Sequence, residues 1–119
     1  MAKILLVDDS QTEIVMFREM LEKMGHDVIV ADNGRDGVSM ARSEQPDVVL
    51  MDIVMPDMNG FQATRQICRD DATKHIPVVI VSSKDQETDK VWGERQGAMG
   101  YLTKPVDADE LAGVMQALI

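Results

Sequence analysis

Five short apolar runs, rich in β-branched residues, alternate along the chain with five longer amphipathic stretches. The expected strands are Ile4–Val7, Val28–Ala31, Val48–Met51, Val78–Val81 and Gly100–Thr103. The expected helices are Thr12–Met24, Arg35–Glu44, Gly60–Arg69, Glu87–Gln96 and Ala108–Leu118. Because the strand runs do not alternate between polar and apolar residues, both faces of each strand should be buried. The pattern predicts an α/β fold, with an all-parallel sheet between two layers of helices.

The expected helix starts carry a local signature of their own. Ser10 with Glu13, and Asp107 with Glu110, have the spacing of a capping box. In that arrangement each side chain accepts a hydrogen bond from a free backbone N–H at the other residue. Both pairs are therefore expected to fix the first turn of a helix.

Length, charge and cysteine content exclude several classes of protein. The 119 residues suit one domain, and no linker or repeat divides residues 1–119. A net charge of −9 argues against binding to nucleic acid or to an anionic membrane surface. The lone Cys68 excludes an internal disulfide, and the chain shows neither a signal peptide nor an apolar stretch of the ~20 residues that span a bilayer. We expect a cytoplasmic protein that neither binds nucleic acid nor inserts into a membrane.

Polar residues follow the expected strands where each one ends. They are Asp8 and Asp9, Asp52, Ser82–Ser83, and Lys104–Pro105. Each has an ordinary explanation alone, such as an acid at a helix start, a turn residue or a surface lysine. The carboxyl ends of parallel strands share one edge of the sheet, however, so these groups should lie close together. Three carboxylates gathered without a cation would repel one another, which favours a functional site.

The chemistry of these groups suggests their roles. A few carboxylates with water suit Mg²⁺, whereas Ca²⁺ would require a loop of regularly spaced acidic ligands that the sequence lacks. One carboxylate can act as a nucleophile and form an acyl phosphate. The metal and a lysine would then neutralise charge on the phosphoryl oxygens, and a hydroxyl could donate to one of them.

Four segments resemble the CheY-like receiver domains of response regulators, in order and with similar spacing across the whole chain. They are ILLVDDS, VVLMDIVMPDMNG, IPVVIVSSKD and GYLTKPV. The resemblance implies a flavodoxin-like (βα)5 three-layer sandwich whose strand order is 2-1-3-4-5. It also implies a signalling domain that catalyses only its own phosphorylation and dephosphorylation, rather than an enzyme that acts on other substrates.

The resemblance implies a role for each residue at the acidic edge. Asp52 would be the phosphoacceptor, and Lys104 and Ser82 would bind the phosphoryl group. The implied ligands of Mg²⁺ are Asp8, Asp9, Asp52 and the backbone carbonyl of Val54. Mn²⁺ is expected to substitute for Mg²⁺. The Lys104–Pro105 peptide bond is expected to be cis.

Further roles follow for residues around this edge. Ser82 and Tyr101 would be the switch hydroxyl and the switch aromatic residue. Val54 and Lys84 would flank the path of the hydrolytic water and so tune dephosphorylation. Tyr101 and Trp92 would belong to the output face, although packing against neighbouring residues explains Trp92 equally well.

The resemblance also implies partners. A sensor histidine kinase, or its phosphotransfer domain, would supply the phosphoryl group. Because the resemblance leaves no room for an output domain, the signal would pass through contact with a downstream protein, or the domain would serve as a phosphate sink. The segments NGFQATRQ and SSKDQETDKVWGERQGA resemble receivers of type IV pilus chemosensory systems, which control twitching motility.

Two other functions are compatible with parts of the pattern. A Mg²⁺-dependent phosphatase of the haloacid-dehalogenase type also uses an aspartate at a strand end, but it needs a second carboxylate two residues later, where this chain has Val54. A flavodoxin-like cofactor carrier needs a hydroxyl-rich phosphate loop after the first strand. Here Asp8 and Asp9 would repel that phosphate.

Overall fold

A computed structural model describes residues 2–119, in which strands and helices alternate without exception. The strands are β1 (Lys3–Val7), β2 (Asp27–Ala31), β3 (Val48–Asp52), β4 (Val78–Ser82) and β5 (Gly100–Thr103). The helices are α1 (Gln11–Lys23), α2 (Gly34–Glu44), α3 (Gly60–Arg69), α4 (Glu87–Arg95) and α5 (Ala108–Leu118). Every expected element is present, and no boundary differs from the expectation by more than about one residue, the usual uncertainty of a helix or strand end.

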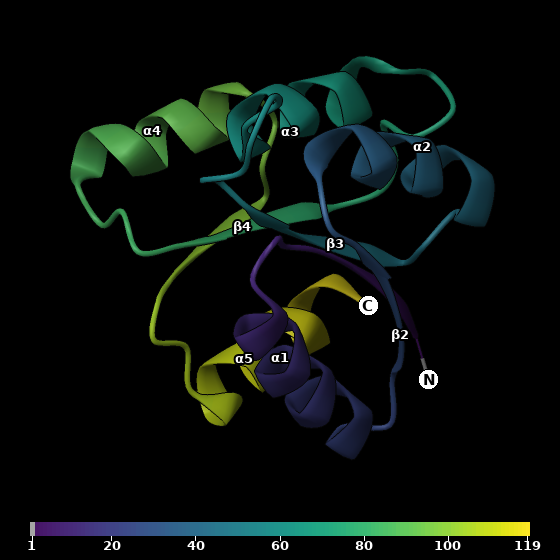
Figure 1. Ribbon diagram of the computed structural model, residues 1–119, viewed down its shortest axis with the longest axis vertical. Helices are drawn as coiled ribbons and strands as arrows, with labels where there is room; N and C mark the ends of the chain where they lie inside the picture. Colours follow the sequence, from purple (N-terminus) through teal and green to yellow (C-terminus); the bar gives the residue numbers. More distant parts are fainter. Residues whose placement is uncertain (1) are drawn as a thin grey trace.

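The five strands form one parallel sheet in the order β2-β1-β3-β4-β5. Figure 1 shows α2, α3 and α4 on one face of the sheet and α1 and α5 on the other. The predicted three-layer α/β fold and its strand order are therefore confirmed. The order reverses between β1 and β3, and the strand ends at this point form the crevice where ligands bind in open α/β sheets.

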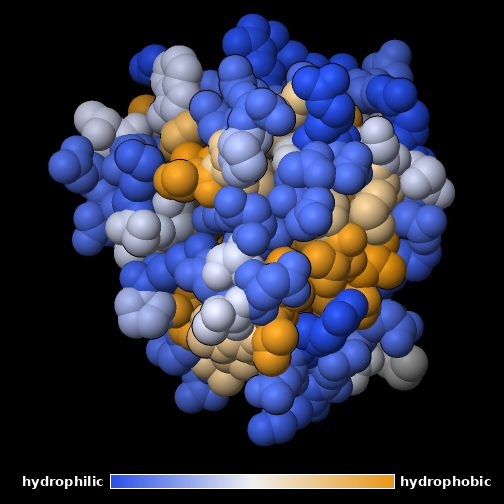
Figure 2. All heavy atoms as spheres, in the orientation of Figure 1, coloured by the Kyte–Doolittle hydropathy of each residue, from blue (hydrophilic) through white to orange (hydrophobic). Residues whose placement is uncertain are grey.

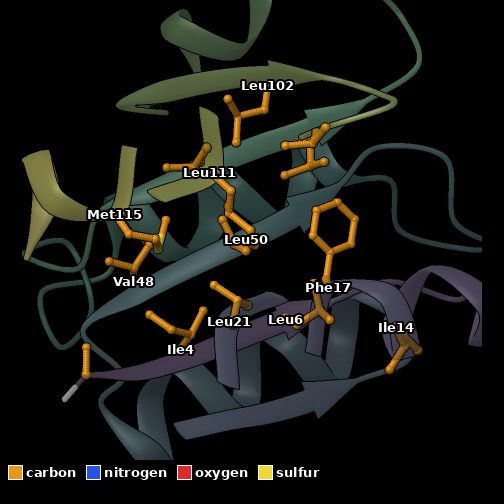
Figure 3. Packing of buried hydrophobic residues seen from close by; sticks show 14 residues of the cluster. Ile4, Leu6, Ile14, Phe17, Leu21, Val48, Leu50, Leu102, Leu111 and Met115 are labelled. Atoms are coloured by element: carbon orange, nitrogen blue, oxygen red, sulfur yellow. The ribbon is translucent and has the colours of Figure 1, made fainter. Parts of the chain in front are cut away.

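Apolar side chains cover both faces of the central strands. Leu6 and Leu50 point toward α1 and α5, where they pack with Phe17 and Leu111 (Figure 3). Because successive side chains of a strand point to opposite faces, the next residues along each strand enter a second core under α2 and α3. Burial on both faces explains the unbroken apolar runs of the sequence and holds β1 and β3 rigidly in the middle of the sheet.

The two predicted capping boxes are only half formed. The side chain of Ser10 accepts a hydrogen bond from the backbone N–H of Glu13, and that of Asp107 accepts one from Glu110. Neither glutamate returns the bond within the part of the chain that the structure describes. The N–H of Ser10 donates to Asp8 Oδ1 at 2.9 Å instead, which leaves the Glu13 carboxylate free to turn elsewhere.

The start of α3 lies directly against the end of β3. The N–H of Gly60 donates to the carbonyl of Ile53 at 2.9 Å, and a Cβ at Gly60 would come within 2.0 Å of the Asp52 carbonyl oxygen. Only glycine allows the backbone to approach so closely. Asn59 and Gln62 form a complete capping box there. This junction fixes the backbone that carries Asp52.

The surface is mainly hydrophilic. Figure 2 shows polar and charged residues over most of one face, with smaller apolar areas between them. Across residues 2–119, every helix is too short or too polar to cross a bilayer.

Candidate functional site

Three carboxylates gather at the carboxyl edge of the sheet. The backbone pairing of Val7 with Met51 between β1 and β3 places the next residues, Asp8 and Asp52, side by side. One oxygen each from Asp8, Asp9 and Asp52 lies within 4.8 Å of the other two. Asp8 and Asp52 are only 2% and 8% exposed, whereas Asp9 faces solvent. Adjacent strand ends thus force buried anions together.

Lys104 brings a positive charge to this cluster from the end of β5. Its ammonium nitrogen lies 3.1 Å from Asp52 Oδ1 and 3.6 Å from Asp8 Oδ2, and it also forms an ion pair with the carboxylate of Glu13 on α1. The backbone N–H of Lys104 donates to the carbonyl of Ser82 at 2.8 Å, which ties this segment to the end of β4. The Lys104–Pro105 peptide bond is cis.

Burial and charge shift the acidity of these groups in opposite directions. Burial, reinforced by the charge of Asp52, raises the pKa of Asp8 from 3.8 to about 6, although the Ser10 N–H opposes the shift. Burial also raises the pKa of Asp52, against the opposing effect of Lys104. Burial alone would lower the pKa of Lys104, but its bonds with Glu13 and Asp52 outweigh that effect and raise it. Asp8 and Asp52 therefore hold protons more tightly than free aspartates, while Lys104 keeps its charge.

A second group of residues connects β4 to β5 beside the cluster. Ser82 is buried, and its hydroxyl accepts a hydrogen bond from the N–H of Lys84 at 3.1 Å. The hydroxyl of Tyr101 donates to the carbonyl of the same Lys84 at 2.6 Å. Ser82 and Tyr101 thus both form hydrogen bonds with the backbone of Lys84.

The acidic cluster opens into a cavity of about 430 Å³. Asp8, Asp52 and Lys104 line it, together with Val54 and Ser83. A cavity of this size at the strand ends can admit a small ligand, and carboxylates next to an ammonium suit a charged one.

Comparison with known proteins identifies the family. Residues 4–116 match the family model described as the response regulator receiver domain. The chain belongs to this family. Protein PilH of Pseudomonas aeruginosa is 63% identical to this receiver over 119 residues, which cover 100% of this chain and 98% of that protein.

Solved structures of receivers share the fold. The chemotaxis protein CheY4 of Vibrio cholerae superposes with a TM-score of 0.93 at 30% identity, covering 100% of this chain and 99% of that one. The receiver domain of the sensor histidine kinase PA1611 from Pseudomonas aeruginosa PAO1 gives a TM-score of 0.91 at 27% identity, covering 98% and 96% of the two chains. That crystal structure has a magnesium ion coordinated in its active site cleft.

The receiver's own donor set fits such an ion. Asp8, Asp9 and Asp52 offer hard oxygen ligands close together, and the single ammonium of Lys104 cannot balance them. A divalent cation held by a few carboxylates and water would relieve their repulsion. The residues present at this edge therefore suit Mg²⁺.

Of the remaining predicted residues, some line the cavity and others do not. Val54 lies at its edge with 63% of its surface exposed. Ser83 lines the cavity in place of Ser82, whose hydroxyl turns to the backbone of Lys84. Trp92 lies on α4 and is 49% exposed, so it is neither buried in the core nor fully open to solvent. The structure is thus compatible with both explanations of Trp92.

Glu13 belongs to the site although sequence reasoning assigned it only to a capping box. Its carboxylate pairs with Lys104 and lines the cavity with Asp8 and Asp52. A signal for this existed in the sequence, because Glu13 lies in the first turn of the helix that follows Asp8. The first turn of such a helix starts at the same edge of the sheet as the strand ends.

Proposed function

We propose that this receiver is a stand-alone response regulator that accepts a phosphoryl group on Asp52 from a histidine kinase or its phosphotransfer domain. The observation that carries the proposal is the placement of Asp52. Asp52, which is 8% exposed, ends the central strand, and its carboxylate has Lys104 at 3.1 Å and Asp8 and Asp9 beside it. A buried nucleophile with a cation on one side and a metal-binding carboxylate pair on the other suits phosphoryl transfer.

The transfer is a displacement at phosphorus. An oxygen of Asp52 forms a bond to phosphorus while the bond from phosphorus to the donor's histidine nitrogen breaks, and that nitrogen keeps the electron pair. Lys104 can donate hydrogen bonds to the phosphoryl oxygens from its present position, 3.1 Å from Asp52. Asp52 must be ionised to attack. Burial raises its pKa, and the same lysine limits that rise.

Asp8, Asp9, Asp52 and the backbone carbonyl of Val54 would hold Mg²⁺, for which Mn²⁺ would substitute. The bound ion would supply positive charge that neutralises the phosphoryl oxygens. The carboxylate cluster of this chain and the magnesium ion in the PA1611 receiver domain support the assignment.

The signal would leave the site through Ser82 and Tyr101. A phosphoryl group on Asp52 would attract the Ser82 hydroxyl and Lys104, and the bond that now joins Ser82 to Lys84 would be lost. Because Tyr101 is bonded to the same Lys84, its ring would be free to move and to change the face formed by α4 and β5. A phosphoryl group that favours one of two arrangements in this way shifts an existing equilibrium.

Trp92, on the exposed side of α4, would contribute to the downstream contact together with Tyr101. We place the protein in the cytoplasm, in a type IV pilus chemosensory pathway that controls twitching motility. The 63% identity to Protein PilH and the two surface segments that resemble such receivers support this pathway. The output face would contact a downstream protein, or the domain would act as a phosphate sink for its kinase. A net charge of −9 disfavours nucleic acid as a partner.

The residue at position 54 does not support the hydrolysis of external phosphoesters. A phosphatase of the haloacid-dehalogenase type needs an acid two residues beyond its nucleophile, and Val54, 63% exposed, has no proton to give. The chemistry of this chain would then be limited to its own acyl phosphate.

The proposed function is tested by incubating the protein with Mg²⁺ and acetyl phosphate. Intact-mass spectrometry should show the mass of one added phosphoryl group. A matched sample with EDTA should show little or none, because the phosphoryl charge is then poorly neutralised. A protein that gains no phosphoryl group with Mg²⁺ present would contradict the proposal.

Asp9→Ala should weaken Mg²⁺ binding by at least about tenfold, because loss of a direct ligand should cost no less than loss of an outer-shell partner. Isothermal titration with Mg²⁺ measures the affinity. Asp109→Ala is a matched control, since it removes an exposed aspartate on α5 and should leave the affinity unchanged. Equal affinities for Asp9→Ala and the wild type would remove Asp9 from the ligand set.

Val54→Asn combined with Lys84→Glu should shorten the lifetime of the phosphorylated protein. Val54 covers the cavity edge with apolar surface, and neither wild-type side chain can act as a base at neutral pH. The new amide can hold the hydrolytic water by a hydrogen bond, which corresponds to decay about tenfold faster. Loss of the adduct is followed at fixed Mg²⁺, with Val54→Ile as the apolar control. Equal or slower decay in the double variant would contradict the assignment.

A further inference from the structure

Among the residues that the structure describes, Lys104 is the one cation that lines the cavity of about 430 Å³. Its ammonium is already paired with the carboxylate of Glu13. The Glu13 side chain reaches across from the first turn of α1, and its carboxylate forms an ion pair with the Lys104 ammonium. The side chain of Lys104 is 15% exposed and that of Glu13 is 29% exposed, so water screens this pair only in part.

The lysine already serves two carboxylates. Its ammonium donates hydrogen bonds to Glu13 and to Asp52, and the Asp8 carboxylate lies 3.6 Å from the same nitrogen as a third negative neighbour. A phosphoryl group that arrives on Asp52 must therefore share Lys104 with Glu13 or displace it. Displacement leaves the Glu13 carboxylate facing phosphoryl oxygens across the same cavity, where two like charges repel.

Glu13 brings a negative charge to the cavity, because its carboxylate is paired with the Lys104 ammonium. Its charge therefore opposes any anion that approaches Asp52. Glu13 also leaves the reciprocal bond of its capping box unmade, as the N–H of Ser10 donates to Asp8 instead. The Glu13 carboxylate is therefore not used in capping α1 and is available to pair with Lys104.

We propose that Glu13 is an inhibitory positioning residue, which holds Lys104 in the unphosphorylated arrangement and slows the entry of anionic phosphoryl donors. The proposal rests on the proposed function. Glu13 does not touch the reacting atoms; it acts through Lys104 and through its own charge. The receiver would then need a partner that can displace Glu13 from the lysine, so that small anionic donors phosphorylate the protein slowly and a docked partner does so faster.

Glu13→Gln tests the proposal, because glutamine has the same size and its backbone N–H is still capped by Ser10. At saturating Mg²⁺, the variant should react with acetyl phosphate, a dianion at neutral pH, about tenfold faster than the wild type. The gain should be smaller with phosphoramidate, a monoanion, because repulsion scales with the charge of the donor. Both gains should shrink as salt is added.

Two further variants keep the result interpretable. Glu19→Gln makes the same charge change on the exposed side of α1 and should leave both rates within about twofold of the wild type, because water and salt screen exposed charges. Glu13→Ala removes the carboxylate without adding an amide that could bind Lys104, and it should also accelerate the reaction with acetyl phosphate.

The outcomes separate the two claims. A wild type that takes up no phosphoryl group overturns the proposed function, and with it the role of Glu13. A wild type that takes up the group while Glu13→Gln reacts at the same or a lower rate overturns only the inhibitory role. An equal gain with both donors would also overturn it, since that result would reflect altered structure rather than charge.

Discussion

Asp8→Asn is expected to stabilise the metal-free protein by about 2–3 kcal/mol at neutral pH, a large fraction of the stability of a small domain. Asp8 is only 2% exposed, and burial together with the charge of Asp52 raises its pKa from 3.8 to about 6. Asparagine keeps the oxygen that accepts the Ser10 N–H bond but carries no charge. The variant therefore removes a buried anion without losing its main contact.

The gain should depend on pH in a defined direction. Between about pH 4 and pH 6 the folded protein keeps the proton of Asp8 while the unfolded chain releases it, so this residue lowers wild-type stability as pH rises through that range. The variant lacks this loss. Its advantage over the wild type should be small at pH 4 and complete above pH 7.

Urea unfolding with EDTA at several pH values measures this difference. Excess Mg²⁺ should reverse it, because the wild type gains stability by binding the metal and Asp8→Asn has lost a ligand. Asp109→Asn, on the exposed first turn of α5, serves as the control. A variant no more stable than the wild type above pH 7, or a gain independent of pH, would contradict the electrostatic account of the cluster.

Asp52→Asn should abolish phosphorylation while leaving the fold intact. The amide has nearly the same shape as the carboxylate, so the junction of β3 with Gly60 is preserved, since that contact involves the backbone of residue 52. Amide oxygen is a weak nucleophile, and the variant also lacks the anion next to Lys104. Loss of the like charge beside Asp8 should further leave the metal-free variant at least as stable as the wild type.

The fold could be predicted from the sequence because burial on both faces leaves a strong pattern. Val48 to Met51 is one unbroken apolar run, and such a run identifies a central parallel strand. The pattern failed only at its polar end, where Asp52 still pairs with Val81 and therefore belongs to β3. The strand order came from the resemblance to receivers, because periodicity says nothing about which strands are neighbours.

The part of the site that lies at strand ends could be predicted from the sequence. Asp52 is the last residue of its strand, Asp8 and Lys104 directly follow theirs, and the three meet at one edge of the parallel sheet. Glu13 was missed because its position depends on how α1 rotates against the sheet and on which partner its side chain chooses. A local capping rule assigned it to Ser10, whereas the partly buried ammonium of Lys104 offers a stronger partner than a backbone N–H.

The most direct test of the central claim is the location of the phosphoryl group. The wild type and Asp52→Asn are incubated with Mg²⁺ and acetyl phosphate, and intact-mass spectrometry is followed by peptide mapping of the adduct. Our account predicts one phosphoryl group on Asp52 in the wild type and none in the folded variant. An adduct of equal yield in Asp52→Asn, on Asp9 or on any other residue, would show that Asp52 is not the acceptor.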